Sequence, residues 1–167
     1  FETQAIAMLQ RAREEDVPIS VIVADIDHFK RVNDIWGHQV GDSAIAGFGD
    51  LLRSAIRSTD IAGRVGGEEF ALVGRIDDLS AVAGLHLLTT LRQADMPHGT
   101  RVTASIGMAS GPLKSDDDWK LLYSLADQAL YEAKAEGRDC AVAGATEEYP
   151  DELGDMPRRQ ARDDRAA

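Results

Sequence analysis

The chain has 167 residues, of which 44% are hydrophobic, and it carries a formal net charge of −11 at pH 7. This length suffices for one domain that buries its own core, while the single cysteine, Cys140, excludes an internal disulfide and favours a cytoplasmic setting. The acidic charge argues against nonspecific nucleic-acid binding, and no apolar run approaches the ~20 residues that cross a bilayer, so neither nucleic acid nor membrane is an expected partner of this segment.

Apolar periodicity predicts the first elements in chain order: a helix over residues 1–14, a strand over 19–27, a short helix or turn over 28–37 and a helix over 40–57. Residues 19–27 are apolar on both faces, which is typical of a central strand covered on both sides. Two short strands then flank Gly66–Gly67, where we expect a two-residue hairpin loop with both glycines at positive φ.

The second half of the chain continues the alternation. A helix over 77–94 is followed by a strand over 101–110, a helix over 117–136 that ends at Gly137, and a short last strand from Cys140. The helix side chains that we expect to face the core are Ile6, Leu9, Ile45, Phe48, Leu52, Ile56, Leu79, Val82, Leu85, Leu88, Leu91, Leu121, Leu125, Ala129 and Ala133.

Strands that alternate with helices, with one hairpin among them, predict an α/β (α+β) fold in which a mixed central sheet is flanked by helices. We place this domain at residues 1–144. Residues 145–167 are polar, mixed in charge and poor in aliphatic side chains, which predicts a disordered tail. The chain begins inside an amphipathic helix, so we interpret it as the cytoplasmic output domain of a larger protein, truncated at its N-terminal side.

Asp25 ends an otherwise buried strand, and a buried carboxylate requires a helix amide, a cation or water. Ligands gather at such strand ends in open α/β sheets, so Asp25 is a candidate metal ligand. Asp27 has a local explanation, because it can cap the next helix through the amides near Phe29. The free amides of His28 and Phe29, beside Lys30, form a candidate phosphate cradle, although a solvated lysine is the alternative.

The hairpin places a second pair of carboxylates near the first strand. In a two-residue loop Arg64 lies opposite Glu69 and can neutralise it, which leaves Glu68 without a partner. If the hairpin lies beside the first strand, Glu68 and Asp25 converge, and two carboxylates with substrate phosphates are common protein ligands of Mg²⁺. A solvated polar turn is the alternative interpretation.

Four stretches together resemble the GGDEF family of diguanylate cyclases, in family order and spacing: "DIDHFKRVNDIWGHQVGD" (25–42), "RSTDIAGRVGGEEF" (57–70), "VTASIGMA" (102–109) and "ADQALYEAKAEGRD" (126–139). The resemblance implies a ferredoxin-like, palm-type sheet with an added β-hairpin that carries the GGEEF motif. It also implies a homodimer of GTP-loaded domains that condenses two GTP into cyclic di-GMP and two pyrophosphates.

The resemblance implies a metal and catalytic set. Asp25 and Glu68 would bind Mg²⁺ or Mn²⁺ through their side chains, and Ile26 would bind it through its backbone carbonyl. Glu68 would accept the 3′-OH proton. Glu69 completes the motif, and we rank it below Glu68 because Arg64 is expected to neutralise it.

The resemblance also implies triphosphate contacts. Lys30 would neutralise phosphate charge, the amides of His28 and Phe29 would cradle the phosphates, and Lys134 and Arg138 would bind the β- and γ-phosphates. From the residues alone, the preferred interpretation of Lys134 and Arg138 is a pair of cations that stabilise a helix C-terminus.

Asn33 and Asp42 would recognise guanine, with His38 nearby. A carboxylate that accepts from guanine N1–H and N2–H₂ rejects adenine, so Asp42 favours GTP. "RSTD", with Arg57 and Asp60, matches the family's RxxD site, at which the product cyclic di-GMP inhibits. A solvated histidine is the alternative for His38, and an ordinary surface pair is the alternative for Arg57 and Asp60.

Three features depart from the family pattern: the segment that usually precedes position 1 is absent, Asp139 replaces the usual asparagine, and His28 replaces a common phenylalanine, although the family contact at His28 is through the backbone. An active enzyme is the preferred interpretation, because degenerate members lose the metal aspartate or the motif glutamate, and Asp25 and Glu68 are both present. The alternative is a non-catalytic module that binds GTP or cyclic di-GMP. A cyclase for another nucleotide is disfavoured by Asp42.

Overall fold

The computed structural model describes residues 1–76, 81–96, 99, 101–115 and 117–144. The helices are α1 (Glu2–Glu14), α2 (Phe29–Trp36), α3 (His38–Ala55), α4 (Ala81–Gln93) and α5 (Asp118–Ala135). The strands are β1 (Ile19–Ile26), β2 (Ile61–Arg64), β3 (Glu69–Arg75), β4 (Ala104–Gly111) and β5 (Ala141–Ala143). Among the described residues, no helix combines the length and apolarity that spanning a bilayer would require.

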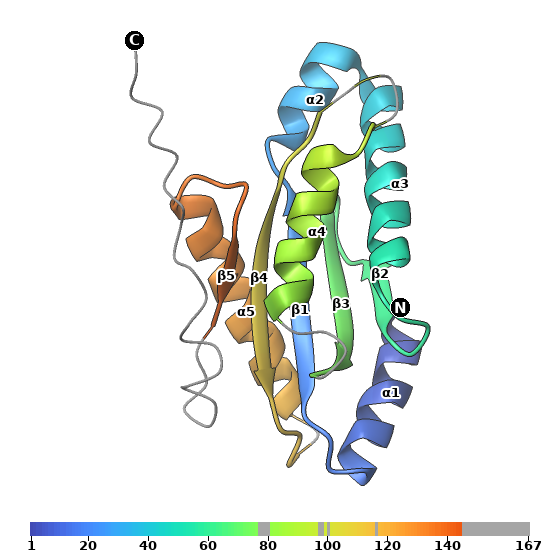
Figure 1. The fold of residues 1–167 in the computed structure, drawn as a ribbon, viewed down its shortest axis with the longest axis vertical. Helices are drawn as coiled ribbons and strands as arrows, with labels where there is room; N and C mark the ends of the chain where they lie inside the picture. The colour runs from blue at the N-terminus through green and yellow to red at the C-terminus, as the bar shows by residue number, and fades with distance from the viewer. Residues whose placement is uncertain (77–80, 97–98, 100, 116, 145–167) are drawn as a thin grey trace.

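One five-stranded sheet of order β2-β3-β1-β4-β5 organises the domain (Figure 1). β1 pairs antiparallel with β3 and β4, β2 pairs antiparallel with β3, and β5 runs parallel to β4. α3 and α4 cover one face, and α5 and α1 cover the other. The predicted mixed sheet flanked by helices is therefore confirmed, with β1 as its buried central strand.

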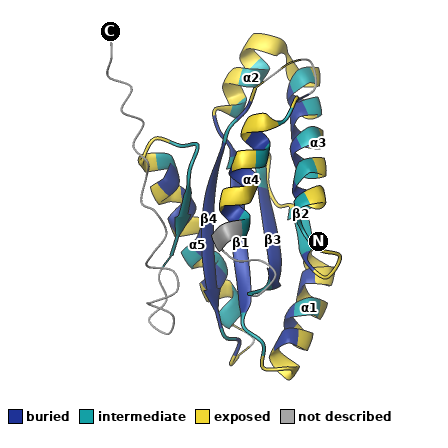
Figure 2. Cartoon of the chain, in the orientation of Figure 1, coloured by how far each residue is buried: buried dark blue, intermediate teal, exposed yellow. Residues whose placement is uncertain are grey.

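The two faces of β1 contribute to two separate hydrophobic clusters. Ile22, Ala24 and Ile26 point toward α3 and α4, while Val21 and Val23 point toward α5 and α1, as the alternation of a strand requires. Figure 2 shows the central strands buried and the outer faces of the helices exposed. β1 is consequently held from both sides, and the position of its carboxyl end is fixed.

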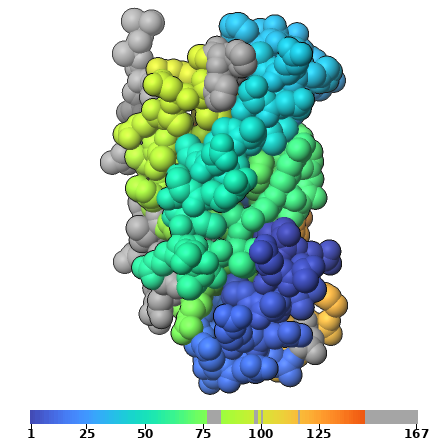
Figure 3. Space-filling model, turned by 90° about the vertical axis from the view of Figure 1, so that its right-hand side faces the viewer, coloured from blue at the N-terminus to red at the C-terminus, as the bar shows by residue number. Residues whose placement is uncertain are grey.

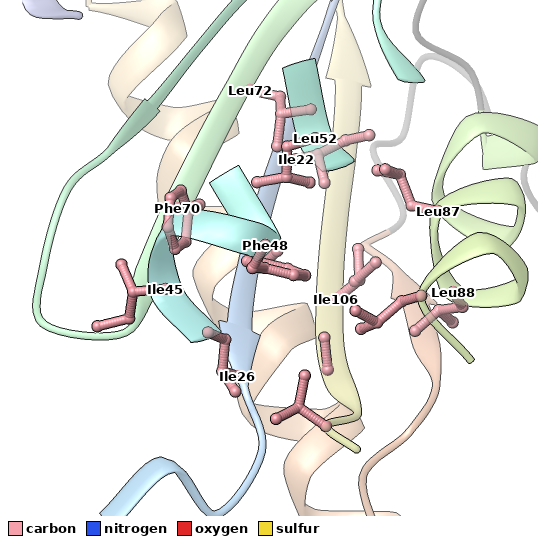
Figure 4. Packing of buried hydrophobic residues seen from close by; sticks show 14 of the residues in the cluster. Ile22, Ile26, Ile45, Phe48, Leu52, Phe70, Leu72, Leu87, Leu88 and Ile106 are labelled. Atoms are coloured by element: carbon pink, nitrogen blue, oxygen red, sulfur yellow. The ribbon is translucent and has the colours of Figure 1, made fainter. Parts of the chain in front are cut away.

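The α3 side of the core is drawn in Figure 4. Phe48 of α3 meets Phe70 of β3 edge to face, with ring centroids 5.1 Å apart, in a geometry that aromatic pairs favour. Phe70 follows Glu69 directly, so this contact anchors the strand that emerges from the GGEEF hairpin. On the neighbouring edge, α1 lies against the segment of β2 and β3 (Figure 3), where Phe1 sits on Gly63.

Three side chains expected in the core are exposed instead: Ile6, Leu85 and Leu121. The nearby Ala5, Leu87 and Leu122 take the buried positions. Adjacent apolar residues leave the orientation of a helix ambiguous in the sequence, and the sheet selects the side that packs more closely. Leu79, the side chain of Val82 and the tail predicted over 145–167 lie outside the described residues.

The contact between β4 and α5 depends on Gly107. A Cβ atom at this position would overlap the backbone of Ala126 and would stand 2.8 Å from the Cα of Leu130. Neither neighbour is a flexible side-chain end that can move aside. The close approach of α5 to the sheet, which also positions the C-terminal turns of α5, therefore requires glycine here.

We expect Gly107→Ala to lower the free energy of unfolding by about 1–3 kcal/mol or more, because the methyl group forces α5 away from the sheet. Urea denaturation followed by circular dichroism measures this loss. Gly67→Ala is the control, since a Cβ at Gly67 would meet nothing within 4 Å. Equal losses in the two variants would contradict the packing argument.

Candidate active site at the end of the central strand

Asp25 lies at the carboxyl end of β1, between Glu69 of β3 and Ser105 of β4 in the strand register. Its side chain is 13% exposed, and its Oδ2 atom lies 3.0 Å from the Lys134 Nζ of α5. By the alternation along β1, Asp25 shares the α5 face with Val21 and Val23. The carboxylate therefore stands at the end of an apolar row, with one cation as its immediate partner.

Burial is the main reason why the pKa of Asp25 is raised above its ordinary value. The hydrogen bond and charge of Lys134 oppose this effect, whereas repulsion from the Glu68 and Asp27 carboxylates adds to it. Glu68 is held nearby because the Ile26 N–H donates to the Glu68 carbonyl at 3.2 Å. The two carboxylates that the sequence reasoning brought together thus interact at one strand end.

The hairpin differs from its prediction. β2 ends at Arg64 and β3 begins at Glu69, so four residues form the loop, and Arg64 lies opposite Phe70 rather than Glu69. Neither Gly66 nor Gly67 has positive φ. The Arg64 Nε–H donates to the carbonyls of Gly66 at 3.0 Å and Gly67 at 2.8 Å. The expected pairing of Arg64 with Glu69 is wrong, because this guanidinium holds the loop backbone instead.

Glu69 consequently belongs to the strand-end cluster. The Tyr123 hydroxyl donates to its Oε1 atom at 3.5 Å, and its pKa is raised, first by burial and then by the charges of Asp127 and Asp25. The reason given for ranking Glu69 below Glu68 therefore fails. Sequence reasoning missed Tyr123 and Asp127, although their spacing from Lys134 on one helix face was a usable signal.

Asp27 does not cap α2, contrary to prediction. It is 4% exposed and accepts three hydrogen bonds, from the Ser105 hydroxyl at 2.6 Å, the Thr103 hydroxyl at 2.7 Å and the Asp139 N–H at 2.9 Å. These donors belong to β4, the segment before it and the turn after α5. Asp27 is turned into the protein, where it joins the ends of three segments beside Asp25.

The candidate phosphate cradle lies at the start of α2. His28 precedes the helix in the left-handed region at φ 54°, and the helix begins at Phe29 without a side-chain cap. Among the described residues, the N–H groups of His28 and Phe29 have no hydrogen-bond partner. Lys30 is exposed in the first helical turn. Unpaired amides at a helix N-terminus favour an anionic group.

The C-terminal end of α5 closes with paired turns. The N–H of Gly137 donates to the Lys134 carbonyl at 3.4 Å, and that of Arg138 donates to the Ala133 carbonyl at 3.0 Å. Gly137 has φ 113°, so this is the Schellman arrangement expected of glycine at a helix end. Lys134 contacts Asp25 directly, while Arg138 precedes the Asp139 amide that Asp27 binds. The structure thus brings both predicted phosphate ligands toward the end of β1.

The candidate guanine readers lie on the adjoining helices α2 and α3. Asn33 belongs to α2, and its Oδ1 atom is buried without a hydrogen-bond partner among the described residues. A Cβ atom at Gly41 of α3 would overlap this oxygen. Asp42 and His38 are exposed on α3. A buried acceptor without a partner beside an exposed carboxylate is suited to a ligand edge that carries hydrogen-bond donors.

The RxxD residues form a local turn before β2. The Arg57 N–H donates to Asp60 Oδ2 at 3.0 Å, and the Asp60 N–H donates to the Arg57 carbonyl at 3.1 Å. Asp60 is 7% exposed, whereas Arg57 is exposed. Asp60 Oδ1 has no hydrogen-bond partner among the described residues. The pair is therefore a built turn that presents the arginine to solvent.

The chemistry of the donor set fits a hard divalent cation. Asp25, Glu68 and the Ile26 carbonyl are oxygen donors of the kind that Mg²⁺ prefers. Burial raises the pKa of Asp25, and the neighbouring Lys134 offsets this effect only in part. Within the described ranges, no group of three or more histidine, cysteine, aspartate or glutamate side chains could hold a metal ion by itself. Substrate oxygens or water would have to complete the coordination.

Comparisons with known proteins agree on one family. A sequence profile described as "Diguanylate cyclase, GGDEF domain" matches residues 1–140. The diguanylate cyclase DgcS of Shewanella oneidensis is 38% identical over 139 residues, which cover 82% of this chain and 46% of that protein. The response regulator PleD of Caulobacter vibrioides is 33% identical over 151 residues, covering 85% and 33%. The chain spans less than half the length of these curated relatives.

Solved structures are similar over nearly the same region. The GGDEF domain of DgcB from Caulobacter crescentus, in complex with c-di-GMP, has a TM-score of 0.76 and 27% identity over 87% of this chain and 89% of that one. The active GGEEF domain of a diguanylate cyclase from Vibrio cholerae has a TM-score of 0.73 and 31% identity over 86% and 94%.

The raised pKa of Asp25 predicts how its charge affects stability. Ionisation costs more in the folded than in the unfolded state, so the protein loses unfolding free energy as pH rises through the folded pKa. We expect Asp25→Asn to melt at a higher temperature than wild type at pH 7. The difference should shrink as pH falls through the folded pKa, which lies above 3.8, and vanish only well below the unfolded pKa, where both states are protonated. Thermal melts across pH, with the exposed Asp34→Asn as control, measure this. A lower melting temperature for Asp25→Asn at pH 7 would contradict the assignment.

Proposed function

Because this chain belongs to the GGDEF family of diguanylate cyclase domains, we propose that it condenses two GTP into cyclic di-GMP and two pyrophosphates. The observation that carries this proposal is the cluster at the end of β1. There Asp25 is paired with Lys134 and is close enough to Glu68 for their charges to repel. These residues combine two carboxylates that can bind a cation with a positively charged lysine that can bind the phosphates of one nucleotide.

The proposed reaction is an in-line displacement at the α-phosphorus. The 3′-oxygen of one GTP attacks the α-phosphorus of the GTP held by a facing domain, the new O3′–P bond forms, and the bond to the β-phosphate oxygen breaks as pyrophosphate leaves. The Glu68 carboxylate accepts the 3′-OH proton. A divalent cation, Mg²⁺ or Mn²⁺, held by Asp25, Glu68 and the Ile26 carbonyl would supply electrostatic stabilisation of the phosphate charge.

The remaining candidate residues bind and orient the substrate. Lys30 and the amides of His28 and Phe29 receive the phosphates at the α2 N-terminus, where the helix dipole favours negative charge. Lys134 and Arg138 bind the β- and γ-phosphates. Two oppositely placed copies must meet for each 3′-OH to reach its target, so the catalytic form is a homodimer.

Guanine recognition rests on Asn33 and Asp42, with His38 beside them. The buried Asn33 Oδ1 lacks a partner, and a donor on guanine would satisfy it. Adenine presents no donor pair that Asp42 can accept, so the site discriminates against ATP by leaving polar groups unpaired.

We further propose product inhibition through Arg57 and Asp60, by binding of cyclic di-GMP to the exposed guanidinium, whose turn the buried Asp60 fixes. The solved relative DgcB was obtained in complex with c-di-GMP. The second candidate function is a module that binds GTP or cyclic di-GMP without turnover. The exposure of Arg57 is the observation that favours it, since this site requires no catalysis.

Incubation with GTP and Mg²⁺ should yield cyclic di-GMP, detected chromatographically, whereas ATP should yield no cyclic product. Glu68→Gln should lower kcat by about 100-fold or more, because the proton acceptor is lost. Specific activity should rise with protein concentration, since two copies must meet. Glu132→Gln, at an exposed position on α5, is the control. Full turnover by Glu68→Gln would remove Glu68 from its role, and GTP binding without turnover would support the binding module.

Gly41→Ala tests whether Asn33 takes part in substrate recognition. The methyl group would overlap the Asn33 side-chain oxygen and crowd Phe29 Cζ at 3.1 Å, so both side chains must shift. We expect KM for GTP to rise roughly tenfold, the cost of one hydrogen bond, and a thermal melt of the same variant measures the separate cost of the crowding. Gly49→Ala in the same helix is the control, because its Cβ would meet Phe70 at an ordinary 3.4 Å. An unchanged KM would exclude Asn33 from guanine recognition.

A further inference from the structure

The turn after α5 is held by a contact between Arg92 and Asp139, to which neither the resemblance nor the comparisons assign a role. Arg138 and Asp139 both adopt left-handed backbone conformations, with φ 65° and φ 48°. For residues other than glycine this conformation costs about 1–2 kcal/mol each, so it persists only where the surroundings fix it. The contacts that fix this turn therefore also fix the backbone from which the Arg138 side chain extends.

Arg92, near the end of α4, donates two hydrogen bonds to Asp139. Its Nε–H donates to the Asp139 Oδ1 atom at 2.9 Å, and its Nη2–H donates to the Asp139 backbone carbonyl at 2.7 Å. The fork of one guanidinium thus holds the side chain and the main chain of the same residue, which a flexible ammonium cannot reproduce. On the opposite side of Asp139, its N–H donates to the buried Asp27.

The arrangement crosses the two layers of the domain. α4 packs on the face of Ile22 and Phe70, whereas α5 packs on the face of Val21 and Val23. The Arg92–Asp139 pair therefore ties a helix on one face to the turn that ends the helix on the other face. Through Asp27 the same turn is tied to the end of β1, two residues beyond Asp25.

We propose that Arg92 is a positioning residue for the triphosphate site. It does not touch the substrate, but through Asp139 it holds Arg138 in the conformation that presents its guanidinium to the β- and γ-phosphates. Among the described residues Arg138 has no ion-pair partner of its own. An anionic ligand would therefore bind an arginine whose backbone conformation is fixed before the ligand arrives. This inference rests on the proposed binding of GTP, and it adds to that function a residue on α4.

The test compares Arg92→Ala, Arg92→Lys and Asp139→Asn with wild type. Arg75→Ala is the matched control, because Arg75 makes a similarly exposed ion pair with Glu15 at 2.9 Å, at the other end of β1. Arg92→Ala should raise KM for GTP about three- to tenfold and leave kcat within about twofold, since uniform binding is lost. Arg92→Lys can keep at most one of the two contacts, and Asp139→Asn keeps both acceptor atoms but loses the carboxylate charge, so their KM values should fall between wild type and Arg92→Ala. Arg75→Ala should leave KM unchanged.

A second measurement is independent of turnover. Hydrogen exchange of the Asp139 amide should be faster in Arg92→Ala than in wild type, and unchanged in Arg75→Ala. Faster exchange with an unchanged KM would overturn the proposal, because the pair would then be only structural. Unchanged exchange would overturn it as well. A wild-type chain that binds no GTP would defeat the proposed function itself, whereas active wild type with an unaffected Arg92→Ala defeats only this inference.

Discussion

The buried carboxylate of Asp27 is the interaction on which the candidate site depends. An aspartate inside a protein is costly unless hydrogen bonds compensate its burial, and here both carboxylate oxygens are occupied by donors from three segments. Because Asp27, residues 103–105 and Asp139 are far apart in sequence, the network forms only when β4 and the α5–β5 turn are docked on β1. Folding and assembly of the site are thus one event, and the positions of Asp25 and Arg138 are coupled through a residue that has no chemical step of its own.

Asp25, in contrast to Asp27, has few partners that compensate its burial. Burial raises the pKa of its carboxylate, Lys134 as its cationic partner opposes this effect, and repulsion from Glu68 adds to it. A purely structural position would have an apolar residue or a fully paired acid there. An incompletely compensated charge is instead what a cation site requires, because the ligand then provides the missing compensation. This arrangement at the strand end suits the proposed cation and the anionic phosphates that would accompany it.

Much of the fold was predictable, because the responsible patterns are local. The two-sided apolar run of β1 and Gly137 at the end of α5 identified a central strand and a helix end correctly. The hairpin was predicted wrongly, since a Gly-Gly pair permits a two-residue turn but does not require one. Its four-residue loop follows from the register of β2 and β3, in which Arg64 lies opposite Phe70. Helix faces with adjacent apolar residues, such as Leu121 and Leu122, were decided in the same way by packing.

The sequence by itself determined the family, the chemistry of the side chains and the presence of Asp25 at a buried strand end, because residue identity and spacing are written directly in the chain. Only the tertiary structure decided which of these groups act on one another. In the structure, Asp27 accepts hydrogen bonds from β4 and the α5–β5 turn and does not cap α2, and Arg64 binds the carbonyls of the hairpin loop. Tyr123 donates to Glu69, and Arg92 pairs with Asp139. The physical reason is that hydrogen bonds and ion pairs require contact within about 3 Å, and contact between distant segments is set by how helices pack on the sheet rather than by local sequence.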